Sequence, residues 1–129
     1  MPLHLSAITL LVPDYDAGIA FYVGQLGFTL IEDRAMPAAK RWVLVAPPGS
    51  RETRLLLAKA DARAQTARIG DQTGGRVAFF LTTDDFARDH AAMLAKGVVF
   101  LEEPRQEPYG TVAVFRDPFG NKWDLIQPA

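Results

Sequence analysis

The chain has 129 residues, of which 49% are hydrophobic, and its formal net charge is −1. It is long enough to bury one hydrophobic core, and it has no excess of basic residues for binding nucleic-acid phosphates. No apolar run approaches the ~20 residues that span a bilayer, and the absence of cysteine excludes disulfides and thiolate chemistry. The start "MPLHLSAITL" lacks a basic region and a cleavage site. We therefore expect a cytoplasmic protein that binds neither nucleic acid nor membrane.

The first half of the chain predicts a strand, a helix and three further strands. "LSAITLLV" is apolar and rich in β-formers, and "PDYDAGIAFYVGQLGF" after it has apolar residues at helical spacing. Asp14 or Asp16 can cap this helix, and Gly27 can end it in the left-handed conformation. Turn formers separate "FTLIED", "RWVLVAP" and "TRLLLA", which are typical of short strands. Residues 3–58 are therefore predicted to form a β-α-β-β-β module.

The second half repeats this order. Residues 59–75 are polar and predict a linker, part of which could form a short helix. "VAFFLTT" predicts a strand, and "DDFARDHAAMLAKG" predicts a helix that Asp85 caps and Gly97 ends. "VVFLEE", "TVAVFRD" and "KWDLIQ" then predict three more strands. Residues 76–128 are therefore a second β-α-β-β-β module.

The two helical segments match at an offset of about 70 residues, which indicates an internal duplication. Neither module is large enough to bury both faces of its own sheet. The predicted fold class is α+β, a single domain over residues 1–129. Its two four-stranded mixed sheets each carry a helix on the outer face, and they curl so that their other faces enclose a cleft.

Three segments resemble a known family: "VPDYDAGIAFYVGQLGF", "TDDFARDHAAMLAKGV" and "DPFGNKWDLIQP". Over nearly its whole length the chain resembles the vicinal oxygen chelate superfamily, which contains glyoxalase I, extradiol dioxygenases, fosfomycin-resistance enzymes and bleomycin-resistance proteins. In such proteins the modules form incomplete barrels that two subunits frequently share. The resemblance therefore implies a homodimer.

The resemblance also implies a metal site with one ligand from the first strand and one from the last strand of each module. The matching positions are Ala7, Leu56, Ala78 and Asp124. Only Asp124 has a donor atom, and a single carboxylate does not hold zinc or iron in competition with water. His4 is an odd number of residues from Ala7 and points to the other face, whereas His90 lies on a helix row that should pack against the sheet. We therefore expect no metal and no cofactor.

Asp124 remains a candidate functional residue, because it is an acid on a cleft face with apolar neighbours. Such a carboxyl group is poorly solvated, so it could titrate at a raised pH or pair with a base. The alternative interpretation is a salt bridge to Arg54, Arg41 or Lys122. Arg54 and Lys122 lie two residues from Leu56 and Asp124, so a period of two places both on the cleft side. There they could receive an anionic ligand or extend to solvent at the rim.

Aromatic side chains are the second group of candidate ligand-binding residues. Trp42, Phe80, Phe115 and Tyr109 could line a cavity and stack on a planar ligand, and Tyr109 lies in a predicted loop. Packing in the core is the alternative interpretation for Phe115 and for Trp123. "DPFGN" predicts a β-turn with Pro118 at its second position and Gly120 at its fourth.

The function that these patterns favour is binding of a small, partly aromatic or amphipathic molecule in the inter-module cleft without a metal. The alternatives are a metal-free lyase or isomerase with Asp124 as general acid or base, and a metal-dependent glyoxalase or dioxygenase if the alignment shifts. A structural or regulatory dimer with a filled cavity is a third hypothesis. Asp124 is the candidate catalytic residue. The candidate ligand-binding residues are Ala7, Arg41, Trp42, Arg54, Leu56, Ala78, Phe80, Tyr109, Phe115 and Lys122.

Overall fold

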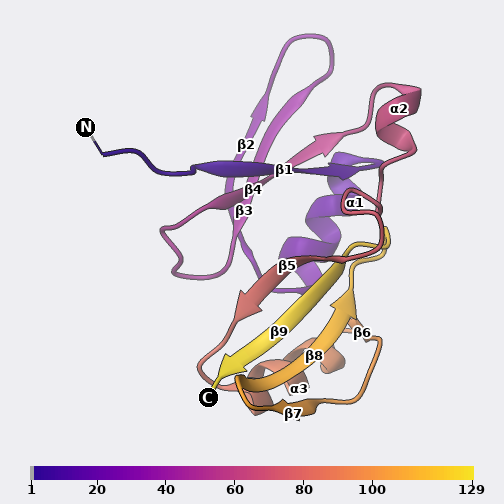
Figure 1. The fold of residues 1–129 in the computed structure, drawn as a ribbon. Helices are drawn as coiled ribbons and strands as arrows, with labels where there is room; N and C mark the ends of the chain where they lie inside the picture. The colour runs from indigo at the N-terminus through magenta and orange to yellow at the C-terminus, as the bar shows by residue number, and fades with distance from the viewer. Residues whose placement is uncertain (1) are drawn as a thin grey trace. The chain divides into compact units, whose positions relative to one another are not determined.

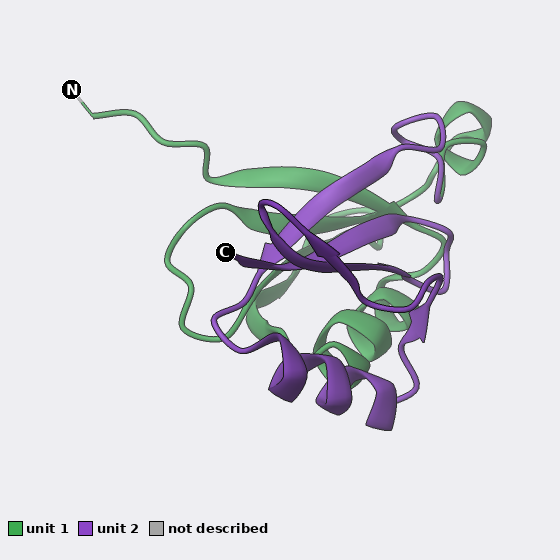
Figure 2. Ribbon diagram, turned by 60° about the horizontal axis from the view of Figure 1, so that its bottom comes forward, with its two compact units in different colours: residues 1–69 green, residues 70–129 purple. Residues whose placement is uncertain are grey.

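The computed structural model describes residues 2–129, which form two compact units that divide between Ile69 and Gly70 (Figures 1 and 2). The first unit contains β1 (Ala7–Val12), α1 (Tyr15–Ile19), the π-helical η1 (Ala20–Gln25), β2 (Thr29–Ala35), β3 (Arg41–Ala46), β4 (Arg54–Lys59) and α2 (Arg63–Thr66). The second contains β5 (Val77–Thr82), α3 (Phe86–Ala95), β6 (Val99–Phe100), β7 (Arg105–Glu107), β8 (Gly110–Arg116) and β9 (Lys122–Pro128). The predicted α+β class with two strand-helix-strand modules is confirmed. Within the described residues, no helix is long and apolar enough to cross a membrane.

The sheet of the first unit has the strand order β1-β4-β3-β2, with β1 parallel to β4 and the other pairs antiparallel. Alternate residues of its inner strands point toward α1 and are fully buried, as Val43, Val45 and Leu57 show. A Cβ atom at Gly18 of α1 would lie 3.1 Å from the Leu57 side chain and 3.2 Å from that of Val12. The absence of a side chain at Gly18 therefore lets α1 approach this face of the sheet closely.

The first predicted helix begins and ends where the sequence indicates, but its second half winds differently. Asp14 Oδ2 accepts a hydrogen bond from Ala17 N at 3.1 Å, and Gly27 has a φ of 83°. Between them, Leu26 N donates to Phe21 O at 2.8 Å, five residues back. The chain therefore forms α1 followed by a π-helical turn instead of one continuous α-helix.

The sheet of the second unit has the order β5-β9-β8-β6, and β7 also pairs with β8. The prediction of four strands was wrong here, because β7 adds a fifth and β6 extends only over Val99–Phe100. The residues of β7, "RQE", are polar and lie between Pro104 and Pro108, so they carry no strand pattern. They form a strand because β8 offers them a partner, with Arg105 opposite Val112.

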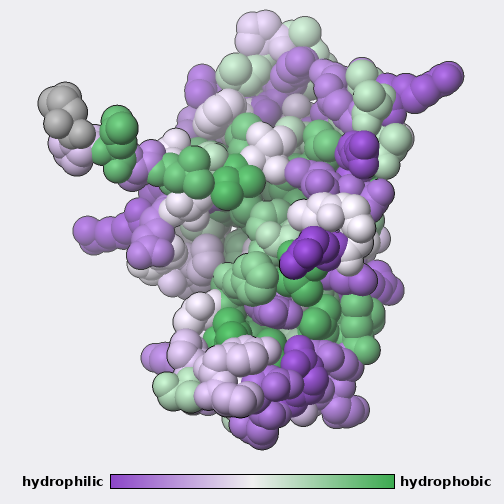
Figure 3. Space-filling view, in the orientation of Figure 1, coloured by the Kyte–Doolittle hydropathy of each residue, from purple (hydrophilic) through white to green (hydrophobic). Residues whose placement is uncertain are grey.

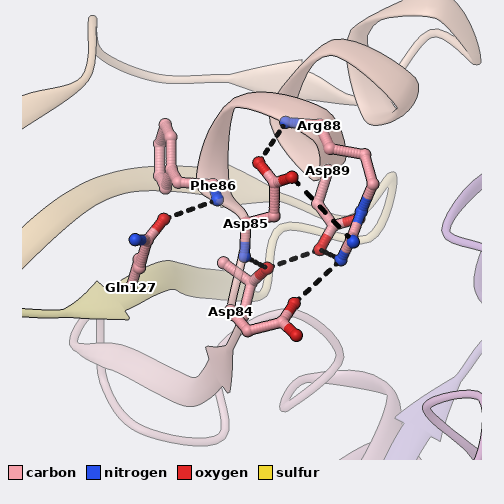
Figure 4. Close-up of polar contacts among 7 residues, drawn as sticks. Asp84, Asp85, Phe86, Arg88, Asp89 and Gln127 are labelled. Atoms are coloured by element: carbon pink, nitrogen blue, oxygen red, sulfur yellow. Dashed lines mark hydrogen bonds and ion pairs between the residues drawn. The ribbon is translucent and has the colours of Figure 1, made fainter.

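Helix α3 is joined to the end of β9 by hydrogen bonds at its first turn (Figure 4). Asp85 Oδ1 accepts from Arg88 N at 3.1 Å, which confirms the predicted cap. Thr83 Oγ1 accepts from Asp85 N at 2.9 Å, and Gln127 Oε1 of β9 accepts from Phe86 N at 2.7 Å. These bonds satisfy N–H groups that a helix start leaves without an intrahelical partner, and they fix α3 against one face of the sheet.

An aromatic cluster fills the space between α3 and this face. The ring of His90 lies 5.3 Å from Phe86 and 4.4 Å from Phe100, and Phe115 stacks on Trp123 at 5.7 Å. His90 therefore packs against the sheet, as the helical pattern predicted. The opposite face of the sheet has no helix of this unit over it, and we call it the open face of the second unit.

Candidate functional site

Asp124 lies on the open face of the second unit. The Cα partners of Asp124 in the sheet are Phe80 of β5 and Val114 of β8, and side chains at paired positions share a face. The adjacent residues Trp123 and Leu125 are buried on the α3 side. The strand alternation in "KWDLIQ" therefore separates a core face from a face that carries one carboxylate.

The carboxyl group of Asp124 is only partly satisfied. Its Oδ1 atom is buried and has no hydrogen-bond partner among the described residues. Burial raises the pKa of Asp124, the positive charge of Arg105 lowers it, and the negative charge of Glu102 raises it. Lys122, the one of the three predicted cations that lies in this unit, forms no ion pair with Asp124 within the described part of the chain; its Nζ donates to Gly75 O.

Arg105 and two glutamates form a network beside Asp124. The guanidinium of Arg105 pairs with Glu102 at 3.0 Å and with Glu107 at 2.8 Å. Glu102 Oε2 also accepts from Val114 N at 3.0 Å, and the Tyr109 side chain hydrogen-bonds to Arg105. Glu102 and Arg105 were not among the predicted site residues, because the residues of β7 carry no strand pattern. The only signal for them in the sequence was an acidic residue followed three positions later by a basic one.

Apolar groups surround this carboxylate on the open face. Phe80 is 66% exposed although it is the cross-strand partner of Asp124, and Tyr109 is 54% exposed. Val114 and Ile126 are half-buried on the same face. Ala78 lies at the irregularity that shifts the register between β5 and β9. An exposed phenyl ring next to a poorly solvated acid can hold a ligand that has both a planar apolar part and a hydrogen-bonding group.

Two other predicted site residues of the second unit lie elsewhere. Lys122 is on the open face, but its Nζ donates to Gly75 O at 3.2 Å. Phe115 is fully buried against α3 and stacks on Trp123, so the prediction that it lines a binding cavity was wrong. The run "TVAVFR" is apolar at consecutive positions, and no alternation in it showed which face Phe115 would take.

The first unit also has an open face, on the side of its sheet away from α1. The strand register places Ala7 beside Arg54, and Leu56 beside Leu44. Trp42 shares this face and is half-buried. Arg54 is half-buried, and its Nε atom is enclosed without a hydrogen-bond partner among the described residues.

Arg41 does not belong to this face. It lies on the α1 side, where it pairs with Asp16 at 2.8 Å and with Asp33 at 2.7 Å, and its guanidinium lies 5.3 Å from the ring centre of Tyr15. The Arg41 guanidinium lowers the pKa of Asp33 through a hydrogen bond. Arg41 was predicted to contact a ligand or Asp124; the structure engages it instead with Asp16 and Asp33 on the α1 side of its own unit. Adjacent strand residues point to opposite faces, so Arg41 and Trp42 cannot both line one site.

The donor set at the predicted metal positions does not fit a metal ion. Ala7 and Leu56 of the first unit and Ala78 of the second have hydrocarbon side chains, which leaves Asp124 as the single donor. His4 precedes β1 and is exposed. Within residues 2–129, no group of three or more His, Cys, Asp or Glu side chains is arranged to hold a metal ion. Metal sites in proteins need several such ligands.

Comparison with known proteins agrees with this architecture. The family model of the Glyoxalase/Bleomycin resistance protein/Dioxygenase superfamily matches residues 4–125. The chain belongs to this superfamily. An uncharacterized protein of Shewanella frigidimarina is 53% identical to it over 121 residues, which cover 93% of this chain and 90% of that protein.

Two solved structures share the fold of this chain over almost its whole length. UcmS2 is 30% identical, with a TM-score of 0.84 and coverage of 98% of each chain. TnmS3, an antibiotic binding protein from Streptomyces sp. CB03234, is 31% identical, with a TM-score of 0.79, and the match covers 99% of this chain and 98% of TnmS3.

Proposed function

We propose that this protein binds a small, partly aromatic molecule without a metal, on the open face of the second unit. One observation carries the proposal: Asp124 has a buried oxygen without a hydrogen-bond partner among residues 2–129, and its cross-strand neighbour is the exposed Phe80. A buried polar atom that lacks a partner costs about 1–3 kcal/mol, and a ligand that donates a hydrogen bond recovers part of this cost. The phenyl ring supplies apolar area for the rest of the ligand.

Two further observations support binding. The half-buried side chains of Val114 and Ile126 extend the apolar surface around Asp124. TnmS3, which shares 31% of its residues with this chain, is an antibiotic binding protein. A cytoplasmic location remains a prediction from the sequence.

Substitution of Asp124 and Phe80 tests the proposal, with the fluorescent aromatic alcohol 9-anthracenemethanol as the probe. We expect Phe80→Ala and Asp124→Ala each to weaken binding about tenfold or more, which corresponds to about 1.4 kcal/mol. The Asp124→Ala variant should keep or gain free energy of unfolding, because it removes a poorly solvated carboxylate. Fluorescence titration and chemical denaturation of the full chain measure the two effects.

Leu94→Ala is the matched control, because Leu94 is a 50% exposed apolar residue on α3. It should leave probe binding unchanged.

The pH dependence of stability gives a second check on Asp124. Because folding raises its pKa, the folded state binds the proton more tightly, so the stability from this group falls as pH rises from about 4 through the folded pKa. The Ala variant should lose this decline. A large loss of stability with unchanged binding would instead identify Asp124 as a structural partner.

The second candidate function is metal-free lyase or isomerase chemistry at the same residue. The observation in its favour is the raised pKa of Asp124, because a carboxyl group that burial makes less acidic can transfer protons nearer neutral pH. Binding is preferred because Arg105, the cation whose charge acts on Asp124, is already paired with Glu102 and Glu107.

We also propose that the chain forms a homodimer, which exposed apolar residues near its N-terminus support. Leu3 is 94% exposed, Leu5 is 63% exposed and Ile8 is 43% exposed. Figure 3 shows hydrophobic residues along the extended segment that leads to β1. Light scattering at micromolar concentration should give twice the mass of one chain, and the double variant Leu3→Ser, Leu5→Ser should shift the mass toward one chain. A monomeric wild-type protein would contradict this proposal and leave the fold unaffected.

A further inference from the structure

We propose that Arg54 forms a second binding subsite, on the open face of the first unit, which takes the carboxylate of an amphipathic organic anion. This inference goes beyond the site at Asp124, since it rests on different residues in a different unit. Arg54 is the first residue of β4, and its Cα partner on β1 is Ala7. A methyl group at Ala7 occupies little of the space beside the guanidinium.

The guanidinium of Arg54 lacks partners that other arginines have. Its Nε is buried without a hydrogen bond, and Arg54 forms no ion pair within residues 2–129. On the same face, Arg34 pairs with Glu32 at 2.9 Å, so those two charges compensate each other. Arg54 is thus a half-buried cation without a compensating carboxylate among the described residues of its own unit. The Arg54 side chain is half-buried rather than enclosed, so part of it remains exposed to a ligand.

The surface next to Arg54 is apolar. Leu56 lies two residues along β4 and is paired with Leu44 of β3, and both are half-buried. Trp42 follows two residues further along β3. A guanidinium binds carboxylate oxygens through parallel N–H···O bonds, and these bonds strengthen where apolar groups exclude water. The single positive charge and the adjoining leucines together select an anion that has one carboxylate and a hydrocarbon body.

Two probes that share one aromatic ring system test the subsite: the anion 9-anthracenecarboxylate and the neutral alcohol 9-anthracenemethanol. We expect Arg54→Met to weaken binding of the carboxylate to the full chain about tenfold, or about 1.4 kcal/mol, and to leave binding of the alcohol unchanged. Methionine retains much of the apolar stem of arginine and removes the charge. Arg54→Lys keeps the charge without the planar fork, so its carboxylate affinity should lie between those of the wild type and Arg54→Met.

Arg51→Met is the matched control, because Arg51 is an exposed arginine in the loop before β4. It should change neither affinity. The subsite is refuted if the wild type binds the carboxylate no better than Arg54→Met does. It is also refuted if Arg51→Met and Arg54→Met lose carboxylate affinity equally, because the effect would then come from the overall positive charge. Circular dichroism checks that each variant is folded. If Arg54→Met does not fold, the carboxylate affinity of Arg54→Lys decides the test. Failure here leaves the dependence of alcohol binding on Asp124 and Phe80 intact, so the two proposals fail separately.

Discussion

Replacing Phe115 with alanine should reduce the free energy of unfolding by about 3–5 kcal/mol, as expected for a large aromatic residue removed from a core. The Phe115 side chain is fully buried, and its ring lies 5.5 Å from that of Phe100 and 5.7 Å from that of Trp123. Its loss would leave a cavity between β8 and α3 that these rings cannot fill without moving. Chemical denaturation of the full chain measures the change.

Phe80→Ala is the control variant for the loss of stability in Phe115→Ala. Phe80 is 66% exposed, so its removal should change the free energy of unfolding by no more than about 0.5 kcal/mol while weakening binding of the aromatic probe. Both phenylalanines were candidates for ligand contact in the sequence. A stability loss at Phe80 equal to that at Phe115 would show that the open face of the second unit is part of a core.

Replacing Asp117 with alanine should cost at least about 3 kcal/mol, because it leaves three donors without their acceptor at about 1–3 kcal/mol each. Asp117 is fully buried. Its Oδ1 accepts from Phe119 N and Asn121 N, both at 2.9 Å, and its Oδ2 accepts from Asn121 Nδ2 at 2.7 Å. These bonds hold the turn that starts β9, and β9 carries Asp124. The thermal midpoint and the denaturation midpoint should both fall.

Two further substitutions control this experiment. Asp117→Asn keeps one acceptor oxygen, so its loss of stability should be clearly smaller than that of Asp117→Ala. Asp84→Ala removes a 90% exposed carboxylate that pairs with Arg88, and its effect should be below about 1 kcal/mol. Similar effects at Asp84 and Asp117 would mean that the turn does not depend on these hydrogen bonds.

The superfamily scaffold does not fix the chemistry, because one fold can host many sites. In this chain, alanine and leucine occupy three of the four positions that resemble metal-ligand positions, and the fourth is an aspartate beside an exposed phenyl ring. Each open face also has one enclosed polar atom without a hydrogen-bond partner among the described residues: Oδ1 of Asp124 in the second unit and Nε of Arg54 in the first.

The sequence by itself determined the elements that depend on local interactions. Asp14 and Asp85 cap their helices through their own neighbours, and Gly27 and Gly97 take positive φ angles of 83° and 84°. The turn at Asp117 is likewise built from residues within four positions of one another. The repeat of these local signals was enough to predict two modules, and the alternation in "KWDLIQ" was enough to place Asp124 opposite the buried Trp123.

Only the tertiary structure decided which face each remaining candidate takes and what it pairs with. "RWVLVAP" and "TVAVFRD" are apolar at consecutive positions, so their patterns could not show that Arg41 and Phe115 point toward the helices. On that face Arg41 meets Asp33 of the neighbouring strand and Asp16, which lies 25 residues away in the sequence. β7 exists because β8 pairs with it, and this pairing brings Arg105 and Glu102 near Asp124. Contacts between distant segments are set by strand pairing and packing, which a local pattern does not encode.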